Sequence, residues 1–258
     1  MQGWTTSPAD PEAAESGLAA LGWFWHAITR LGEAQILLPA FLAGVAWLVF
    51  LSRGRQQIVS GTIGLARRRG PHAHAAILGS ATVGGLPARD AAARWAAGLA
   101  AGTLVTTASK IAFIGYGVGS ALLDFTGFSG HSMYAAAVLP VLAALVGGRA
   151  GAACGTVLAL VIMTSRVRIG AHSWSEAIGG ATLGLAIAGW TLSRYLAPPG
   201  AARAPWWLPL LLAGWLTLLP MRAPPSRTHD WVVRLSLWLS DRPVPYTRQQ
   251  MLFHKETT

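Results

Sequence analysis

The feature that most constrains the fold of this chain is a series of six apolar runs separated by short polar connections. A helix needs about 20 predominantly apolar residues to cross the hydrocarbon layer of a bilayer. Charged residues make up only 12% of the chain, against about 25% in an ordinary soluble domain. We therefore expect an all-α, polytopic transmembrane helical bundle with five to six spans. The predicted spans are residues 34–51, 91–109, 132–147, 150–164, 177–195 and 206–219.

Amphipathic segments flank these runs at both ends. Residues 18–31 are aromatic but too short and too mixed to span, which predicts an interfacial helix. Residues 228–240 are expected to form a helix that lies flat on the membrane surface or packs on the bundle. Its apolar face consists of Trp231, Leu235, Trp238 and Leu239.

The domain organisation follows from these segments. Residues 1–33 form an acidic N-terminal segment, residues 34–220 the transmembrane domain, and residues 221–258 a basic tail with the amphipathic helix. Glycines and an Arg-Arg-Arg-Gly-Pro stretch interrupt residues 58–86, for which we expect a loop with short membrane-surface helices.

The positions of Lys and Arg predict the orientation of the bundle. The connection over residues 52–94 carries seven arginines, and such an excess marks the cytoplasmic side. Residues 110–131 and 165–176 then share the outer face. The tail would also lie outside if residues 206–219 span, although it is basic. The sequence leaves open whether this run is a re-entrant or interfacial hairpin, or whether the tail departs from the charge rule.

The net charge of +10 does not indicate nucleic-acid binding. Most of the basic residues stand in short connections between apolar runs, where membrane orientation is encoded. No aromatic-basic platform or groove motif accompanies them. The expected partners are therefore membrane lipids rather than nucleic acid.

Two outer connections carry histidines with polar partners. In the first, Arg166 stands six residues before His172, and Glu176 stands four residues after it. Residues at i and i+4 share one helix face, so the carboxylate can hold one ring nitrogen and leave the other more nucleophilic. The second connection places His131 at the start of a predicted span. Two histidines with converging cations are suited to phosphoryl transfer.

These motifs resemble the type 2 phosphatidic acid phosphatase superfamily, the membrane branch related to vanadium haloperoxidases. One block of the family's signature is Ser-Arg, five residues, His, three residues, Asp. Ser165, Arg166 and His172 match this block, and Glu176 takes the place of the Asp.

The other two blocks are matched less completely. The family's Pro-Ser-Gly-His corresponds to Ser129-Gly130-His131, with Phe128 in place of the proline. The family's Lys, six residues, Arg-Pro corresponds to Lys110, followed by Gly117-Val118 where Arg-Pro is expected. The resemblance covers roughly residues 23–195.

The resemblance implies a role for each residue. His172 would attack phosphorus to form a phosphohistidine, His131 would act as acid and then as base, and Glu176 would orient His172. No metal or cofactor is expected, since the sequence has no acidic cluster for magnesium and no three-ligand zinc spacing. The predicted phosphate-binding residues are Arg166, Lys110, Ser129, Gly130 and, as a substitute for the missing arginine, Arg168.

The function that follows is hydrolysis of a lipid phosphate or diphosphate at the outer face of a bacterial-type inner membrane. The incomplete block at Gly117 motivates an alternative, a catalytically impaired lipid-phosphate-binding or scaffold protein of the same fold. A transporter or channel is a third hypothesis. It is disfavoured because the charged residues gather at one surface rather than at mid-membrane. The lipid and the oligomeric state are not identified by the sequence.

Overall fold

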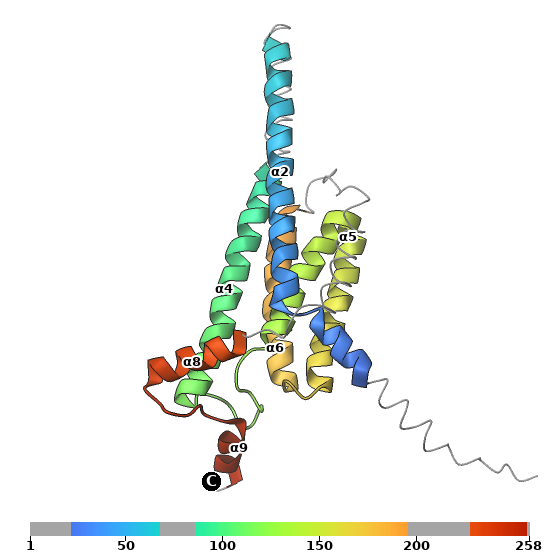
Figure 1. Cartoon of the computed structure of the whole chain (residues 1–258). Coiled ribbons are helices and arrows are strands. Elements are labelled where there is room, and N and C mark those ends of the chain that lie inside the picture. Colours follow the sequence, from blue (N-terminus) through green and yellow to red (C-terminus); the bar gives the residue numbers. More distant parts are fainter. Residues whose placement is uncertain (1–21, 68–85, 196–227, 257–258) are drawn as a thin grey trace, which may run out of the picture.

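The computed structural model describes residues 22–67, 86–195 and 228–256. Within these ranges the chain is all-α, as predicted, and contains no strand beyond an isolated bridge between Ser120 and Phe125. A short helix at residues 22–30 precedes the labelled helices of Figure 1. These are α2 (Ala34–Arg67), α4 (Leu86–Tyr116), α5 (Gly130–Arg168), α6 (Trp174–Tyr195), α8 (Thr228–Ser240) and α9 (Arg248–Glu256).

Three helical stretches of the described chain are long and apolar enough to cross a membrane: Gly22–Phe50, Ala88–Tyr116 and Gly130–Arg168. The prediction of a membrane bundle is therefore confirmed, and the predicted number of spans is confirmed only in part. Helix α6 covers the predicted span 177–195. The sixth run, residues 206–219, lies outside the described residues.

The element α5 contains two of the predicted spans. It consists of two helical arms, because the chain reverses its direction at Gly148. That residue has φ 60° and ψ −135°, a conformation that glycine adopts without the penalty of a Cβ atom. The two arms then run side by side: a Cβ on Gly151 would lie 2.0 Å from the carbonyl oxygen of Ala143. The 39-residue element is thus a helical hairpin whose arms correspond to residues 132–147 and 150–164.

One prediction of local structure is wrong. Residues 58–67 do not form a loop, because α2 continues without a break to Arg67. The glycines of this segment do not end the helix, since a glycine in a helix costs only about 1 kcal/mol and the first proline after Pro39 is Pro71. Residues 68–85 lie outside the described part of the chain.

Helix α8 has the predicted bounds, and the structure adds how it packs. Val232 and Val233 pack against a small core formed with Phe113 and Ile114 of α4. The predicted apolar face points away from this contact, with Trp231 69% and Trp238 77% exposed. The helix therefore packs on the bundle with one face and leaves its aromatic face uncovered. Helix α9 was not predicted.

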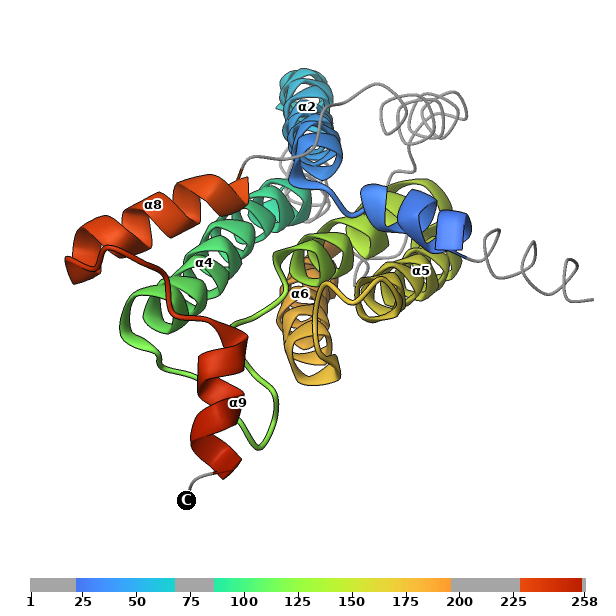
Figure 2. The ribbon, with the colours of Figure 1, turned by 60° about the horizontal axis from the view of Figure 1, so that its bottom comes forward.

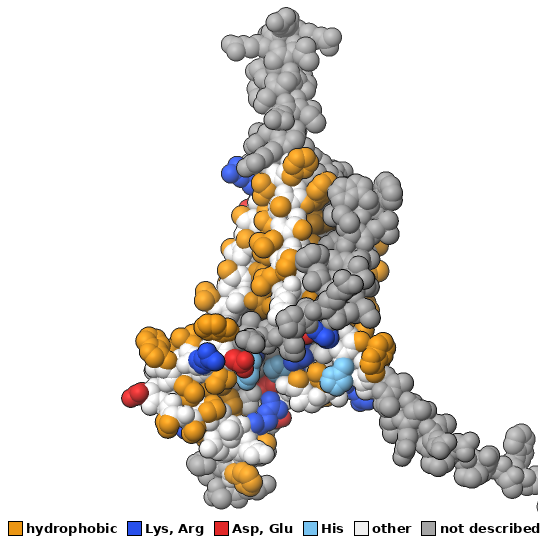
Figure 3. Space-filling model, viewed as in Figure 1, with side chains coloured by type: hydrophobic (Ala, Val, Ile, Leu, Met, Phe, Trp, Pro, Cys, Tyr) orange, Lys and Arg blue, Asp and Glu red, His pale blue; other side chains and the backbone are white. Residues whose placement is uncertain are grey.

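The two ends of the bundle differ in chemical character. The loop at residues 117–129, the connection between α5 and α6, and helices α8 and α9 lie at one end, and the Gly148 turn lies at the other (Figures 1 and 2). Figure 3 shows charged and histidine side chains gathered at the first end, below a surface rich in hydrophobic side chains. We call this the site end. The described part of the basic tail, residues 228–256, also lies there, at the same end as the candidate histidines.

Close packing of α5 on α6 fixes the backbone at the site end. A Cβ on Gly180 would lie 2.4 Å from the carbonyl oxygen of Ser129, and a Cβ on Gly184 would lie 2.3 Å from that of Met133. Small residues allow membrane helices to approach in this way. The N–H of Ser129 also donates to the carbonyl oxygen of Glu176 at 3.0 Å. The first turns of the two helices are therefore held together.

Enlarging Gly184 should force these helices apart. We expect Gly184→Ala to lower the free energy of unfolding by about 1–3 kcal/mol, the usual cost of overpacking a core. The matched control is Gly189→Ala on the same helix, where a Cβ would meet nothing within 4 Å. That change should be neutral or slightly stabilising. Thermal unfolding of both variants in one detergent measures the difference, and equal midpoints would contradict the close approach.

Candidate active site

The candidate site is centred on the connection between α5 and α6. Gly170, at φ 71°, turns the chain after α5. The backbone N–H groups of Ala171 and His172 then donate to the carbonyl oxygen of Arg166 at 3.0 and 3.2 Å. Because α6 begins at Trp174, Glu176 lies in its first turn. The structure thus places His172 Nδ1 2.7 Å from Glu176 Oε2.

This hydrogen bond defines the state of the imidazole. A carboxylate can only accept, so a proton lies on Nδ1, and in the neutral ring the Nε2 atom keeps its lone pair. Burial lowers the pKa of His172, and the positive charges of Lys110 and Arg166 lower it further, while Glu176 opposes them. The imidazole is therefore neutral at neutral pH, as a nitrogen nucleophile must be.

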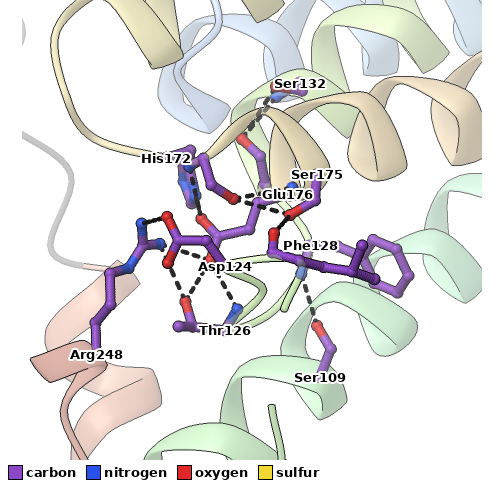
Figure 4. Close-up of polar contacts among 12 residues, drawn as sticks. Ser109, Asp124, Thr126, Phe128, Ser132, His172, Ser175, Glu176 and Arg248 are labelled. Atoms are coloured by element: carbon purple, nitrogen blue, oxygen red, sulfur yellow. Dashed lines mark hydrogen bonds and ion pairs between the residues drawn. The ribbon is translucent and has the colours of Figure 1, made fainter. Parts of the chain in front are cut away.

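The Glu176 carboxylate is buried, with 1% of the side chain exposed, and its oxygens are well supplied with donors (Figure 4). Thr126 donates to Oε1 from its backbone N–H at 2.8 Å and from its hydroxyl. Ser173 N–H donates to Oε2 at 3.2 Å. Burial raises the pKa of Glu176, but the hydrogen bonds from His172 and Thr126 outweigh this effect and lower the pKa to about 2. Glu176 is therefore a fixed anion beside His172.

His131 stands in the first turn of α5, directly after Gly130. It lies close enough to Arg166, Lys110 and His172 for electrostatic interactions with all three. A Cβ added to Gly130 would meet nothing within 4 Å. The two histidines and two cations thus share one region at the site end, and the backbone beside His131 borders open space.

The two cations, Arg166 and Lys110, are both partly buried. Arg166 Nη1 donates to Thr29 Oγ1 at 2.8 Å, and Glu33 interacts with the same guanidinium electrostatically. The Nε atom of Arg166 is buried and has no hydrogen-bond partner within the part of the chain that the structure describes. Buried polar groups are rarely left unpaired. This N–H is therefore available to an anionic ligand, which guanidinium groups bind strongly.

Two other predicted phosphate ligands have contacts of a different kind. Ser129 caps α5: its hydroxyl oxygen accepts from Ser132 N–H at 3.4 Å and from the Ser132 hydroxyl at 3.0 Å. Its side chain therefore supports the helix start. Arg168 is exposed, and its guanidinium lies 5.9 Å from the ring centroid of Trp25. Its described contact is with this ring rather than with the histidines.

Gly117 stands where the family resemblance predicts arginine. The backbone conformation at this position explains why a glycine is found there. Helix α4 ends at this point with Gly117 at φ 72°, a region that residues with side chains rarely adopt. A Cβ there would also lie 3.2 Å from the ring of Tyr246. The C-terminal tail thus covers the position from which the arginine would project.

Sequence reasoning missed three residues that contact the site. Thr29 binds Arg166, Thr126 binds Glu176, and Arg248 of the tail donates to Glu176 Oε1 at 2.7 Å and to Asp124 Oδ2 at 3.0 Å (Figure 4). One feature of the sequence indicates that the tail contributes to the site. The tail is basic, although the predicted topology places it on the outer face, where the charge rule disfavours arginine.

Comparison with known proteins supports the motif-based resemblance. Residues 113–197 match the family described as the PAP2 superfamily, which confirms the resemblance for this segment. A stretch of 89 residues is 46% identical to an "Uncharacterized 22.5 kDa protein in cps region" of Klebsiella pneumoniae. The match covers 32% of this chain and 43% of that relative, so the chain matches less than half of the relative's length. No solved structure matches this chain significantly.

Proposed function

We propose that this chain is an integral-membrane phosphatase that hydrolyses a lipid phosphate or diphosphate through a phosphohistidine at His172. The match to the PAP2 superfamily supports a phosphatase-like fold. The observation that carries the proposal is the contact between His172 Nδ1 and the buried Glu176 carboxylate at 2.7 Å, beside two partly buried cations. This arrangement suits a neutral nitrogen nucleophile facing an anionic substrate.

The proposed reaction has two steps, formation of the phosphohistidine and its hydrolysis. The Nε2 atom of His172 attacks phosphorus in line, the bond from phosphorus to the leaving oxygen breaks, and His131 gives that oxygen a proton. Water then attacks the phosphohistidine while His131 takes a proton from it, which releases phosphate and restores His172. Glu176 stabilises the cationic ring that forms during each transfer.

Positive charge stabilises the phosphoryl group during these steps. Arg166 would bind its oxygens through the unpaired Nε–H, and Lys110 would add a second charge. The first amides of α5, next to Ser129 and Gly130, have no partner within the helix. Such amides favour an anion at a helix N-terminus.

A membrane lipid is the substrate class that fits the position of the site. The histidines lie at the end of the bundle, where the predicted spans leave the membrane, and the exposed Trp231 and Trp238 of α8 lie at the same end. Tryptophan is typical of the membrane–water interface. The arginine-rich connection at residues 52–94 supports a site on the outer face of a bacterial-type inner membrane.

Phosphate release by the purified protein tests the proposal. The substrates are a diacylglycerol phosphate, a polyprenyl diphosphate and a water-soluble phosphate monoester, each in mixed micelles with and without a metal chelator. We expect release from at least one lipid, unaffected by the chelator. Binding of these lipids without release would favour the alternative, an impaired lipid-phosphate-binding protein, which the glycine at position 117 motivates.

The role of Arg166 has its own test. Arg166→Lys should lower kcat/KM nearly as much as Arg166→Ala, by about 10- to 100-fold, because lysine cannot replace a directional guanidinium contact. Arg149→Ala, at the Gly148 turn far from the site, is the control and should leave kcat/KM unchanged. Near-normal activity of Arg166→Lys would show that Lys110 or backbone amides bind the phosphate instead. A large loss in Arg168→Ala would show that Arg168 contributes after all.

A further inference from the structure

We propose that the C-terminal arm, residues 244–256, completes the active site in cis, and that Arg248 is a positioning residue that holds Glu176 and, through it, His172. The inference rests on the proposed function and adds to it a segment outside the matched family region, residues 113–197. Four observations carry it: the contacts of Arg248, the division of donors on Glu176, the docking of the arm, and the capping of α9.

Arg248 joins two acidic residues that come from different parts of the chain. Its Nη2 atom donates to Glu176 Oε1 at 2.7 Å, and its Nη1 atom donates to Asp124 Oδ2 at 3.0 Å (Figure 4). The Arg248 side chain is 35% exposed, while that of Glu176 is 1% exposed. The arginine therefore reaches from the surface to a buried carboxylate, and a rigid fork of donors suits such a bridge.

The donors on Glu176 divide between its two oxygens. Arg248 and Thr126 bind Oε1, whereas His172 and Ser173 bind Oε2. With Oε1 held, the carboxylate cannot turn away from the imidazole. Arg248 also places a positive charge against the buried anion, and a buried charge without a partner is costly.

The arm is docked on the end of α4 through specific contacts. Tyr246 N–H donates to the carbonyl oxygen of Ile114 at 2.8 Å. The rings of Tyr246 and Phe113 pack edge to face, with their centroids 5.8 Å apart. Met251 of α9 is 7% exposed and belongs to the same small core. The absence of a side chain at Gly117 leaves room for Tyr246. The arm is therefore packed against the bundle at the site end.

A reciprocal cap fixes the backbone that carries Arg248. Thr247 N–H donates to Gln250 Oε1 at 2.9 Å, and Gln250 N–H donates to Thr247 Oγ1 at 3.3 Å. This is the capping box that stabilises helix starts. Arg248 is the first residue of α9, so its backbone is held at the point from which it reaches Glu176.

Replacement of Arg248 should change catalysis in a way that a structural role would not. In Arg248→Gln we expect kcat to fall about 10- to 100-fold, as for the loss of a charged hydrogen bond, with little change in KM. Loss of the cation leaves the Glu176 charge uncompensated, which favours protonated His172. The acid limb of the kcat/KM profile should therefore move to higher pH.

Two further variants separate charge from geometry. Arg248→Lys keeps the charge and should restore the position of the acid limb, but it should recover kcat only in part, because a point charge cannot bridge two carboxylates. Arg234→Gln removes a similar charge from the exposed face of α8, where the arginine contacts Trp231. This control should match the unmodified protein in kcat and in pH profile.

A second readout does not depend on turnover. Diethyl pyrocarbonate modifies neutral imidazole, so the pH midpoint of His172 modification, followed by mass spectrometry of its peptide, reports protonation of this residue. Arg248→Gln should raise that midpoint, and Arg248→Lys should restore it. If the protein hydrolyses no tested lipid, the proposed function fails while this midpoint still decides the inference. An unchanged midpoint in Arg248→Gln, at an unchanged unfolding temperature, would overturn it.

Discussion

His172→Ala should abolish phosphate release from every lipid that the unmodified protein hydrolyses. The substitution removes the ring nitrogen that would form the bond to phosphorus. It also leaves Glu176 Oε2 without its imidazole partner at 2.7 Å. Because a covalent route needs its nucleophile in every turnover, the residual rate should approach that of the uncatalysed reaction.

Two measurements check this result. Phosphate release gives the rate, and quenching with labelled substrate tests for an acid-labile phosphoryl group on the protein, which should be missing in the variant. The control is His229→Ala, which removes an exposed histidine from α8 and should retain full activity. Measurable turnover with a trapped phosphoryl group in His172→Ala would show that another residue is the nucleophile.

The environment of His172 adds an expected pH dependence. Burial and the charges of Lys110 and Arg166 lower the pKa of His172, so the ring stays neutral below the pH of about 6.5 at which an ordinary histidine titrates. If protonation of His172 limits the reaction, the acid limb of kcat/KM should lie below this value. An acid limb above it would contradict the placement of the two cations beside the ring.

Local patterns in the sequence were enough to predict several elements of the fold. The bounds of α8 follow from a helical repeat of apolar residues between Arg227 and Asp241. The two arms of α5 follow from apolar runs separated by Gly148-Arg149, of which Gly148 makes the turn. The contact between His172 and Glu176 follows from their i,i+4 spacing across the start of α6, since Glu176 lies in its first turn and His172 two residues before it. In each case the cause acts within a few residues, where periodicity and capping are visible.

Contacts between distant segments could not be predicted in the same way. Arg248 meets Glu176 across 72 positions of the chain, and Arg166 meets Thr29 across 137. Nothing near Arg248 in the sequence distinguishes it from the other arginines of the tail, because its partner is chosen by the docking of Tyr246 on α4. Tertiary packing, rather than local preference, decides such pairs.

The length of α2 shows a different limit of sequence reasoning. The arginines that follow residue 51 mark where an apolar run ends, and the glycines and the Arg-Arg-Arg-Gly-Pro stretch within residues 58–86 predict a loop with short membrane-surface helices. Helix α2 nevertheless continues to Arg67. The edge of an apolar run and the end of a helix have separate causes: hydrophobicity sets the first, whereas backbone breakers and caps set the second.

His131→Ala should slow the hydrolysis of alkyl phosphates far more than that of activated aryl phosphates. The imidazole of His131 lies near His172, Arg166 and Lys110, where it would protonate the leaving oxygen. An alkoxide is a poor leaving group and needs that proton, whereas a nitrophenolate leaves without it. A general acid typically contributes about 10²–10⁴-fold, so the loss on an alkyl substrate should fall in this range.

Comparison of the two leaving groups separates this role from general damage to the site. The rate of the first step with the aryl substrate, measured as a burst of nitrophenol, should stay close to that of the unmodified protein. The second step still needs a base to activate water, so the phosphohistidine should accumulate in His131→Ala. Equal losses on both substrates, without accumulation of the intermediate, would assign His131 to phosphate binding or to the structure of the α5 N-terminus instead.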